Sequence, residues 1–167
     1  AKYRELEREM FTMIGDQEVE VFNAAALSNK CLQAANGAMY LDPERYGAGA
    51  WVELHREKLD ALQELMDETG DDPLLVAYEF KSDRERILRE WPDALDLAKE
   101  ADLAKAKAGV GKLWIGHPAS IGEGIDGLQE HCNTVAFFGQ TWRLDLHDQI
   151  IERIGPKAAA KWGVQQG

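Results

Sequence analysis

The chain has 167 residues, of which 45% are hydrophobic, and a formal net charge of −11 at pH 7. This length fits one ordinary domain, the apolar share excludes wholesale disorder, and no apolar run approaches the ~18 residues of a membrane span. The first residues do not form a signal peptide, and two cysteines, Cys31 and Cys132, are too few for a secreted disulfide scaffold. We therefore expect a reduced, cytoplasmic setting without a membrane partner.

Residues 1–72 carry 7 basic and 16 acidic side chains, and they are predicted to form an acidic helical lead-in. Asn23 is a suitable N-cap for a helix, Asn36-Gly37 is a plausible left-handed stop, and Gly70 ends a later amphipathic helix. Apolar periodicity and turn residues together predict helices at 3–14, 23–35 and 55–69, and a possible hairpin of 38–41 with 51–54.

Residues 73–167 carry 12 basic and 14 acidic side chains, so this part is nearly neutral. Residues 74–78 form a continuous apolar run, which is typical of a strand buried on both faces. Helical and strand patterns then alternate, with strands expected at 74–78, 94–97, 113–116 and 134–138 and helices at 82–90, 101–108 and 144–154. This alternation predicts an α/β fold with a parallel sheet.

The sequence lacks a complete catalytic motif of its own. Gly111-Lys112 resembles the end of a phosphate-binding P-loop, but Leu113 replaces the Ser or Thr that would hold magnesium, and Ala106 stands where the opening Gly belongs. Ser120 lies in Ala119-Ser120-Ile121-Gly122, which lacks the full Gly-x-Ser-x-Gly elbow of a serine hydrolase. The potential metal ligands do not have zinc-type spacing either; they are His117, His131, Cys132 and His147.

Residues 117–127 are predicted to form a glycine-rich loop after the strand at 113–116. Its glycines would allow backbone amides to approach a phosphate or a sugar, with Ser120 donating to a phosphate and Asp126 accepting from ribose hydroxyls. The alternative is a tight connection in which Asp126 is only a turn residue.

Four segments, preceded by a helix, follow one another in an order that resembles a known set of motifs. Gly124-Ile125-Asp126 resembles the end of motif V, and Gln149 with Arg153 matches the opening Gln-x-x-x-Arg of motif VI. The remaining matches are residues 73–83 to the motif IV strand and its turn, residues 135–142 to a strand-plus-Trp segment, and residues 23–37 to a preceding helix. In this respect the chain resembles the second, C-terminal RecA-like lobe of superfamily-two helicases and translocases, specifically the Swi/Snf-type subgroup common in bacteriophages.

The resemblance implies a RecA-like lobe at residues 73–167 whose closing strand lies beyond the chain. It also implies a partner N-terminal lobe of the same polypeptide that binds most of the ATP and Mg²⁺, so this piece would not hydrolyse ATP alone. Gly124 and Asp126 would contact the nucleotide, whereas Ser120 and Trp142 would contact DNA.

In the same family Arg153, with Gln149 beside it, would reach the γ-phosphate and stabilise charge in the transition state. The second Arg of motif VI is replaced here by Pro156. The arginine-finger role is therefore open between Arg153, Lys157 and a residue beyond the chain.

Two other functions stay open on the sequence alone. The first is a non-catalytic α/β module for nucleotide sensing or protein interaction, which the acidic lead-in and the missing catalytic motif favour. The second is a small-molecule enzyme that uses residues 120–126 as a phosphate cradle.

Overall fold

The computed structural model describes residues 24–124 and 127–139, which form parts of two compact units, Ala1–His55 and Arg56–Gly167. The predicted helices at 3–14 and 144–154 lie outside the described residues. No helix within the described ranges is long and apolar enough to cross a membrane.

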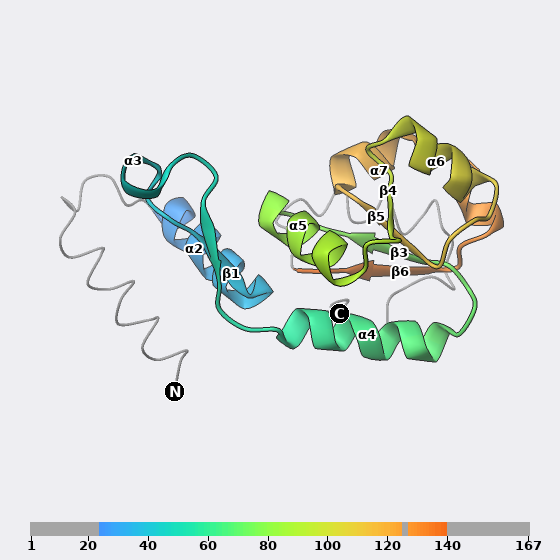
Figure 1. Ribbon diagram of the computed structural model, residues 1–167, viewed down its shortest axis with the longest axis horizontal. Coiled ribbons are helices and arrows are strands. Elements are labelled where there is room, and N and C mark those ends of the chain that lie inside the picture. Colours follow the sequence, from blue (N-terminus) through green and yellow to red (C-terminus); the bar gives the residue numbers. More distant parts are fainter. Residues whose placement is uncertain (1–23, 125–126, 140–167) are drawn as a thin grey trace. The chain divides into compact units, whose positions relative to one another are not determined.

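The first unit contains a helix packed on a two-stranded antiparallel sheet (Figure 1). Helix α2 (Ala24–Asn36) ends at Gly37, which has a φ of 101°, so the predicted left-handed stop is confirmed. Strands β1 (Ala38–Tyr40) and β2 (Trp51–Glu53) form the predicted pair. The loop between them contains a short helix, α3 (Pro43–Tyr46), because Asp42 accepts a hydrogen bond from the Glu44 amide and Pro43 occupies the first helical turn.

The described residues of the second unit form an α/β arrangement with a four-stranded parallel sheet in the order β4-β5-β3-β6. The predicted parallel sheet is therefore confirmed, and each expected strand is present within one or two residues. Its described elements are α4 (Glu57–Thr69), β3 (Leu74–Ala77), α5 (Lys81–Glu90), β4 (Leu95–Asp96), α6 (Glu100–Lys107), β5 (Leu113–Gly116), α7 (Pro118–Gly124), the 3-10 helix η2 (Leu128–Glu130) and β6 (Thr134–Phe137).

Helices cover both faces of this sheet, and successive strand residues point to opposite faces (Figure 1). Leu74 and Val76 pack with α4 and α5, while Leu75 and Ala77 pack with α6, α7 and η2. Burial on both faces explains why β3 is apolar throughout its length.

Helix α4 belongs with the sheet and not with the acidic first unit. Its buried residues Leu59, Leu62, Leu65 and Met66 join the same core cluster as β3. The division between the compact units falls between His55 and Arg56, ahead of the boundary expected at residues 72 and 73. The acidic charge of α4 led to its assignment to the lead-in, but its apolar face packs against the sheet of the second unit.

Candidate functional site

The carboxyl ends of β3, β5 and β6 lie side by side at one edge of the sheet, which we call the carboxyl edge (Figure 1). The ladder continues past the strands, since the Tyr78 amide donates to Gly116 O at 3.1 Å and the Phe138 amide donates to Ala77 O at 2.9 Å. In open α/β sheets, ligands bind outside the carboxyl ends of the strands. The candidate functional site is therefore at this edge of the sheet.

Helix α7 starts at this edge, directly after β5, and the expectation of a loop at residues 117–127 is wrong for Pro118–Gly124. Pro118 suits a first helical position because it has no N–H to satisfy. The His117 carbonyl accepts from the Ser120 and Ile121 amides, both at 2.9 Å, and His117 Nδ1 lies 3.2 Å from the Ala119 amide nitrogen. The glycines of this segment led to the prediction of a loop, although His117 and Pro118 favour the start of a helix.

These contacts also bear on the expectation that backbone amides of residues 117–127 bind a phosphate. The amides of Ala119, Ser120 and Ile121 all donate to His117, so they do not point at a ligand in this conformation. The predicted cradle of loop amides is therefore not present at the start of residues 117–127.

Helix α7 is held onto the sheet by a glycine contact. A Cβ built on Gly116 would lie 2.6 Å from Ile121 Cγ1 and 2.9 Å from Ile121 Cδ1. Ile121 is buried in the core cluster that contains β5 residue Trp114. Only a residue without a side chain at position 116 lets α7 pack this closely against the strand end.

The Tyr78 side chain lies beside His117 at the carboxyl edge. Its ring meets the His117 ring edge to face, with centroids 5.9 Å apart and planes at 73°. Burial, followed by the negative charge of Asp96, raises the pKa of the Tyr78 phenol above its usual value. The phenol therefore stays neutral at physiological pH.

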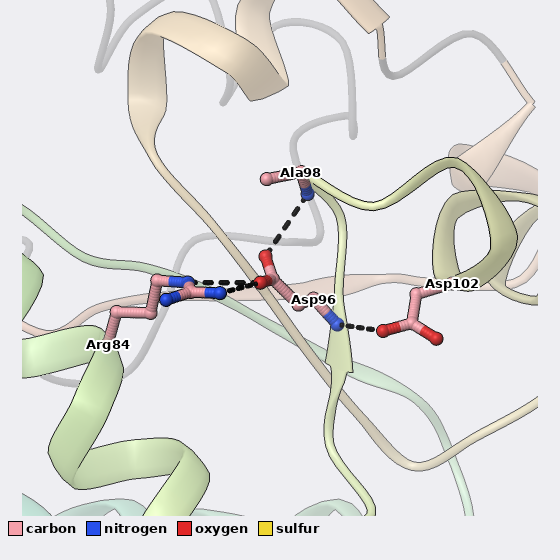
Figure 2. Close-up of polar contacts among 4 residues, drawn as sticks. All are labelled: Arg84, Asp96, Ala98 and Asp102. Carbon is pink, nitrogen blue, oxygen red and sulfur yellow. Dashed lines mark hydrogen bonds and ion pairs between the residues drawn. The ribbon is translucent and has the colours of Figure 1, made fainter.

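A buried carboxylate links the helices on either side of β4 (Figure 2). Asp96, whose side chain is 1% exposed, accepts from Arg84 Nε at 3.0 Å and also from Arg84 Nη2. Its other oxygen accepts from the Ala98 amide at 3.1 Å, and its own amide donates to Asp102 at 3.1 Å. The ion pair raises the pKa of Arg84, which remains charged. Arg84 comes from α5 and Asp102 from α6, so Asp96 fixes both helices to the end of β4.

The first turn of α5 is fixed by a second carboxylate. Asp83, which is fully buried, accepts from the Phe80 amide at 2.9 Å and from the Glu79 amide at 3.3 Å. A carboxylate at this position satisfies amides that the helix itself leaves open. Ser82 and Arg86 are also buried, which gives the inner side of α5 an unusually polar character at the carboxyl edge.

The structure places two of the predicted site residues and leaves four outside the described ranges. Ser120 is exposed on α7, and Gly124 is the last residue of that helix. Asp126, Trp142, Gln149 and Arg153 lie outside the described residues. Of the predicted set, the structure therefore brings Ser120 and Gly124 onto one helix at the carboxyl edge.

Sequence reasoning missed the roles of His117, Tyr78, Arg84 and Asp96. A detectable signal existed for His117, because an acceptor residue followed by Pro is a helix start. A signal also existed for Asp96, which is a charged residue inside the apolar stretch 94–97. Its pairing with Arg84 needs the strand order and could not be read from the sequence.

The other motif candidates lie away from this edge. Gly111 and Lys112 precede β5 at its amino end, whereas a P-loop follows the carboxyl end of a strand. Cys132 precedes β6, and the sulfur of its buried thiol lies 3.4 Å from Pro73 O and 3.2 Å from Thr134 O. Within residues 24–124 and 127–139, no three His, Cys, Asp or Glu side chains are grouped so that they could hold a metal ion.

The comparisons with known proteins give one relative of greater length. No protein-family model matches the chain, and no solved structure matches it. Protein p41 of Acyrthosiphon pisum secondary endosymbiont phage 1 is 41% identical over 164 residues, which cover 98% of this chain and 35% of p41. The chain thus spans about a third of the length of that relative.

Proposed function

We propose that the chain is the C-terminal motor lobe of an ATP-dependent DNA helicase or translocase, with a RecA-like fold in residues 73–167. The observation that carries the proposal is the strand order. The segments that resemble motif IV and the strand-plus-Trp element contain β3 and β6, which are neighbours in one parallel sheet, and Gly124 of the motif V match ends α7, the helix that follows β5, the other neighbour of β3. Residues that are far apart in sequence thereby leave the sheet at one edge, as a shared nucleotide and DNA site requires.

The proposed roles follow the motif matches. Gly124 and Asp126 contact the nucleotide, and Ser120 and Trp142 contact DNA. Gln149 and Arg153 face the γ-phosphate across the cleft between lobes. A cation at that position stabilises transition-state charge and is worth about 10³–10⁵ in rate.

The phosphate-binding and metal-binding groups in the described residues fit a lobe that completes an ATP site together with a second lobe and does not form the site alone. The Gly111-Lys112 pair is at the amino end of β5, and the described residues hold no cluster of metal ligands. ATP and Mg²⁺ are therefore assigned mainly to an N-terminal lobe of the same polypeptide. The greater length of p41 supports a larger parent protein.

The proposal is tested by comparing ATP hydrolysis by the isolated chain with that by the full-length polypeptide that contains it, with and without DNA. We expect no turnover by the isolated chain and DNA-stimulated turnover by the full-length protein. Activity of the isolated chain above a mock-purified sample would contradict the proposal. Nucleotide binding without hydrolysis by the full-length protein would favour the sensing or interaction module instead.

The finger role is tested in the full-length protein with Arg153→Ala and the neighbouring variant Lys157→Ala. Loss of Arg153 is expected to lower kcat by about 10³-fold or more, because the transition-state charge loses its cation. Lys157→Ala is expected to change kcat by less than about tenfold. The reverse result would assign the role to Lys157, and unchanged turnover in both variants would place it beyond the chain.

A further inference from the structure

Arg84 donates to Asp96 with only part of its guanidinium group (Figure 2). Its Nε–H and one N–H of Nη2 donate to the same Asp96 oxygen. A guanidinium also carries the N–H groups of Nη1 and a second N–H on Nη2. Within residues 24–124 and 127–139, no second side chain accepts from Arg84. Arg84 therefore has hydrogen-bond donors left for another acceptor.

The two partners of this ion pair differ in their exposure. The Asp96 side chain is 1% exposed, whereas the Arg84 side chain is 32% exposed. Asp96 is also bound by the Ala98 amide, so its position is fixed by the end of β4 and the turn that follows. The buried carboxylate is thus an anchor, and a ligand can reach the pair only through the guanidinium.

A purely structural role does not account for this arrangement. Buried ion pairs often stabilise a fold no better than well-packed apolar residues of similar volume, because both charges lose their hydration. A guanidinium that a carboxylate holds along one edge is well suited to bind an anion along the other. Its plane is fixed before the ligand arrives, so less conformational entropy is lost on binding.

Lys99 is a second cation close to this pair. Its amide donates to the Asp96 carbonyl at 2.9 Å, and its side chain is exposed. In the part of the chain that the structure describes, its ammonium group has no hydrogen-bond or ion-pair partner. Strand β4 runs parallel to β5, so its last residue, Asp96, lies at the carboxyl edge as well. Arg84 and Lys99 are therefore at the edge of the sheet where open α/β sheets bind ligands.

The charges around the pair set the kind of binding that is expected. Glu85 and Glu100 are exposed on α5 and α6, and Asp102 is bound to the Asp96 amide. These carboxylates offset the two cations, so anions are not attracted from a distance. An anion would be held by direct, charge-assisted hydrogen bonds.

We propose that Arg84, anchored by Asp96, and Lys99 form a binding site for a phosphate group at the carboxyl edge. A tetrahedral phosphate has enough oxygens to accept from the guanidinium and from the ammonium at the same time. The phosphate is that of a nucleotide or of a nucleic-acid backbone. The proposal rests on this geometry and not on the function proposed above.

The direct test is an NMR titration of the chain that follows the Arg84 Nε–Hε resonance, which the bond to Asp96 protects from exchange with water. The probes are metal-free ADP, which carries a pyrophosphate, and an octathymidylate without terminal phosphates, which carries phosphodiesters. Sodium chloride at equal ionic strength is the blank. We expect a saturable shift with a Kd of about 1–10 mM for at least one probe, since a few charge-assisted hydrogen bonds act without a long-range field. The probe that binds more tightly identifies the source of the phosphate. If neither probe shifts the resonance beyond the blank, the proposal is overturned.

Three variants separate ligand binding from a structural role. Arg84→Gln/Asp96→Asn removes the guanidinium together with its anchor, which leaves no buried charge unpaired and keeps the net charge. Binding followed at the Lys99 amide should weaken about tenfold or more. Lys99→Gln, followed at Arg84, should weaken it about threefold or more. Arg89→Gln, at an exposed position of the same helix, is the matched control and should change the Kd by less than about threefold.

Wild-type affinity in the double variant would contradict the proposal and leave the Arg84–Asp96 pair with a structural role alone. Wild-type affinity in Lys99→Gln would remove Lys99 from the site. The titration of the wild-type chain decides the question even if the double variant does not fold.

The outcome is separable from that of the proposed function. Arg84-dependent phosphate binding, with no DNA-stimulated ATP hydrolysis by the full-length polypeptide, would reject the proposed function and leave this inference standing. DNA-stimulated hydrolysis without Arg84-dependent binding would do the opposite.

Discussion

At the scale of single residues, the most consequential buried group is the Asp96 carboxylate. One of its oxygens accepts from the Arg84 guanidinium and the other accepts from the Ala98 amide. A buried carboxylate needs such partners, because burial without them would cost several kcal/mol. The exposed pair Arg56–Glu90, with side chains 45% and 34% exposed, has no such requirement.

We predict that Asp96→Asn lowers the free energy of unfolding by about 1–3 kcal/mol, since Arg84 loses its buried counter-charge while the shape is kept. Glu90→Gln removes the acceptor of the exposed pair with an equally small change of shape and should cost less than about 1 kcal/mol. Urea unfolding followed by circular dichroism measures both values. Equal losses in the two variants would show that burial does not strengthen the Arg84–Asp96 pair.

At the scale of elements, α7 depends on how closely it approaches the end of β5. A methyl group at position 116 would overlap Ile121, whose Cγ1 would lie 2.6 Å from it. The overlap is with a branched side chain in a packed core, so it can be relieved only by shifting α7 or by repacking.

We predict that Gly116→Ala destabilises the chain by about 1–3 kcal/mol through overpacking. In an Ile121→Ala background the same substitution should cost much less, because the overlapping atoms are gone and the added methyl partly refills the cavity. A double-mutant cycle from urea unfolding gives the coupling free energy. Additive effects of the two substitutions would mean that α7 does not pack on Gly116 in solution.

The elements that the sequence predicts well are those whose pattern matches their packing. The apolar run of β3 and the periodic face of α4 both correspond to burial in the structure. Helix α7 is missed because two glycines lower its helix propensity, while Pro118, the His117 contacts and Ile121 packing stabilise it. The link between Arg84 and Asp96 depends on strand order, which residue spacing does not encode. Of the predicted site, Ser120 and Gly124 fall in described positions, and the motif VI residues lie outside them.

At the scale of the whole molecule, the net charge is unfavourable for the DNA binding that the proposed function requires. The charge of −11 opposes association with DNA, yet the part that carries the motif matches is nearly neutral. Exposed acidic residues on and just after α4, including Asp60, Glu64, Asp67 and Asp71, supply much of the negative charge of the second unit. The net charge is therefore a better guide to DNA binding by the isolated chain than to DNA binding by a longer polypeptide that contains it.

From this charge we predict that the isolated chain binds a 20-nucleotide DNA weakly, with a Kd no tighter than about 10⁻⁴ M at 150 mM salt. The triple variant Glu64→Gln/Asp67→Asn/Asp71→Asn removes three negative charges from exposed positions and leaves the buried face of α4 unchanged. Fluorescence anisotropy at 50 mM salt should show a few-fold gain in affinity, because the repulsion is long-ranged when screening is weak. At 200 mM salt the gain should shrink, since the Debye length falls to under about 8 Å. Tight binding by the unmodified chain at both salt concentrations would show instead that a local DNA site outweighs the acidic surface even without a partner lobe.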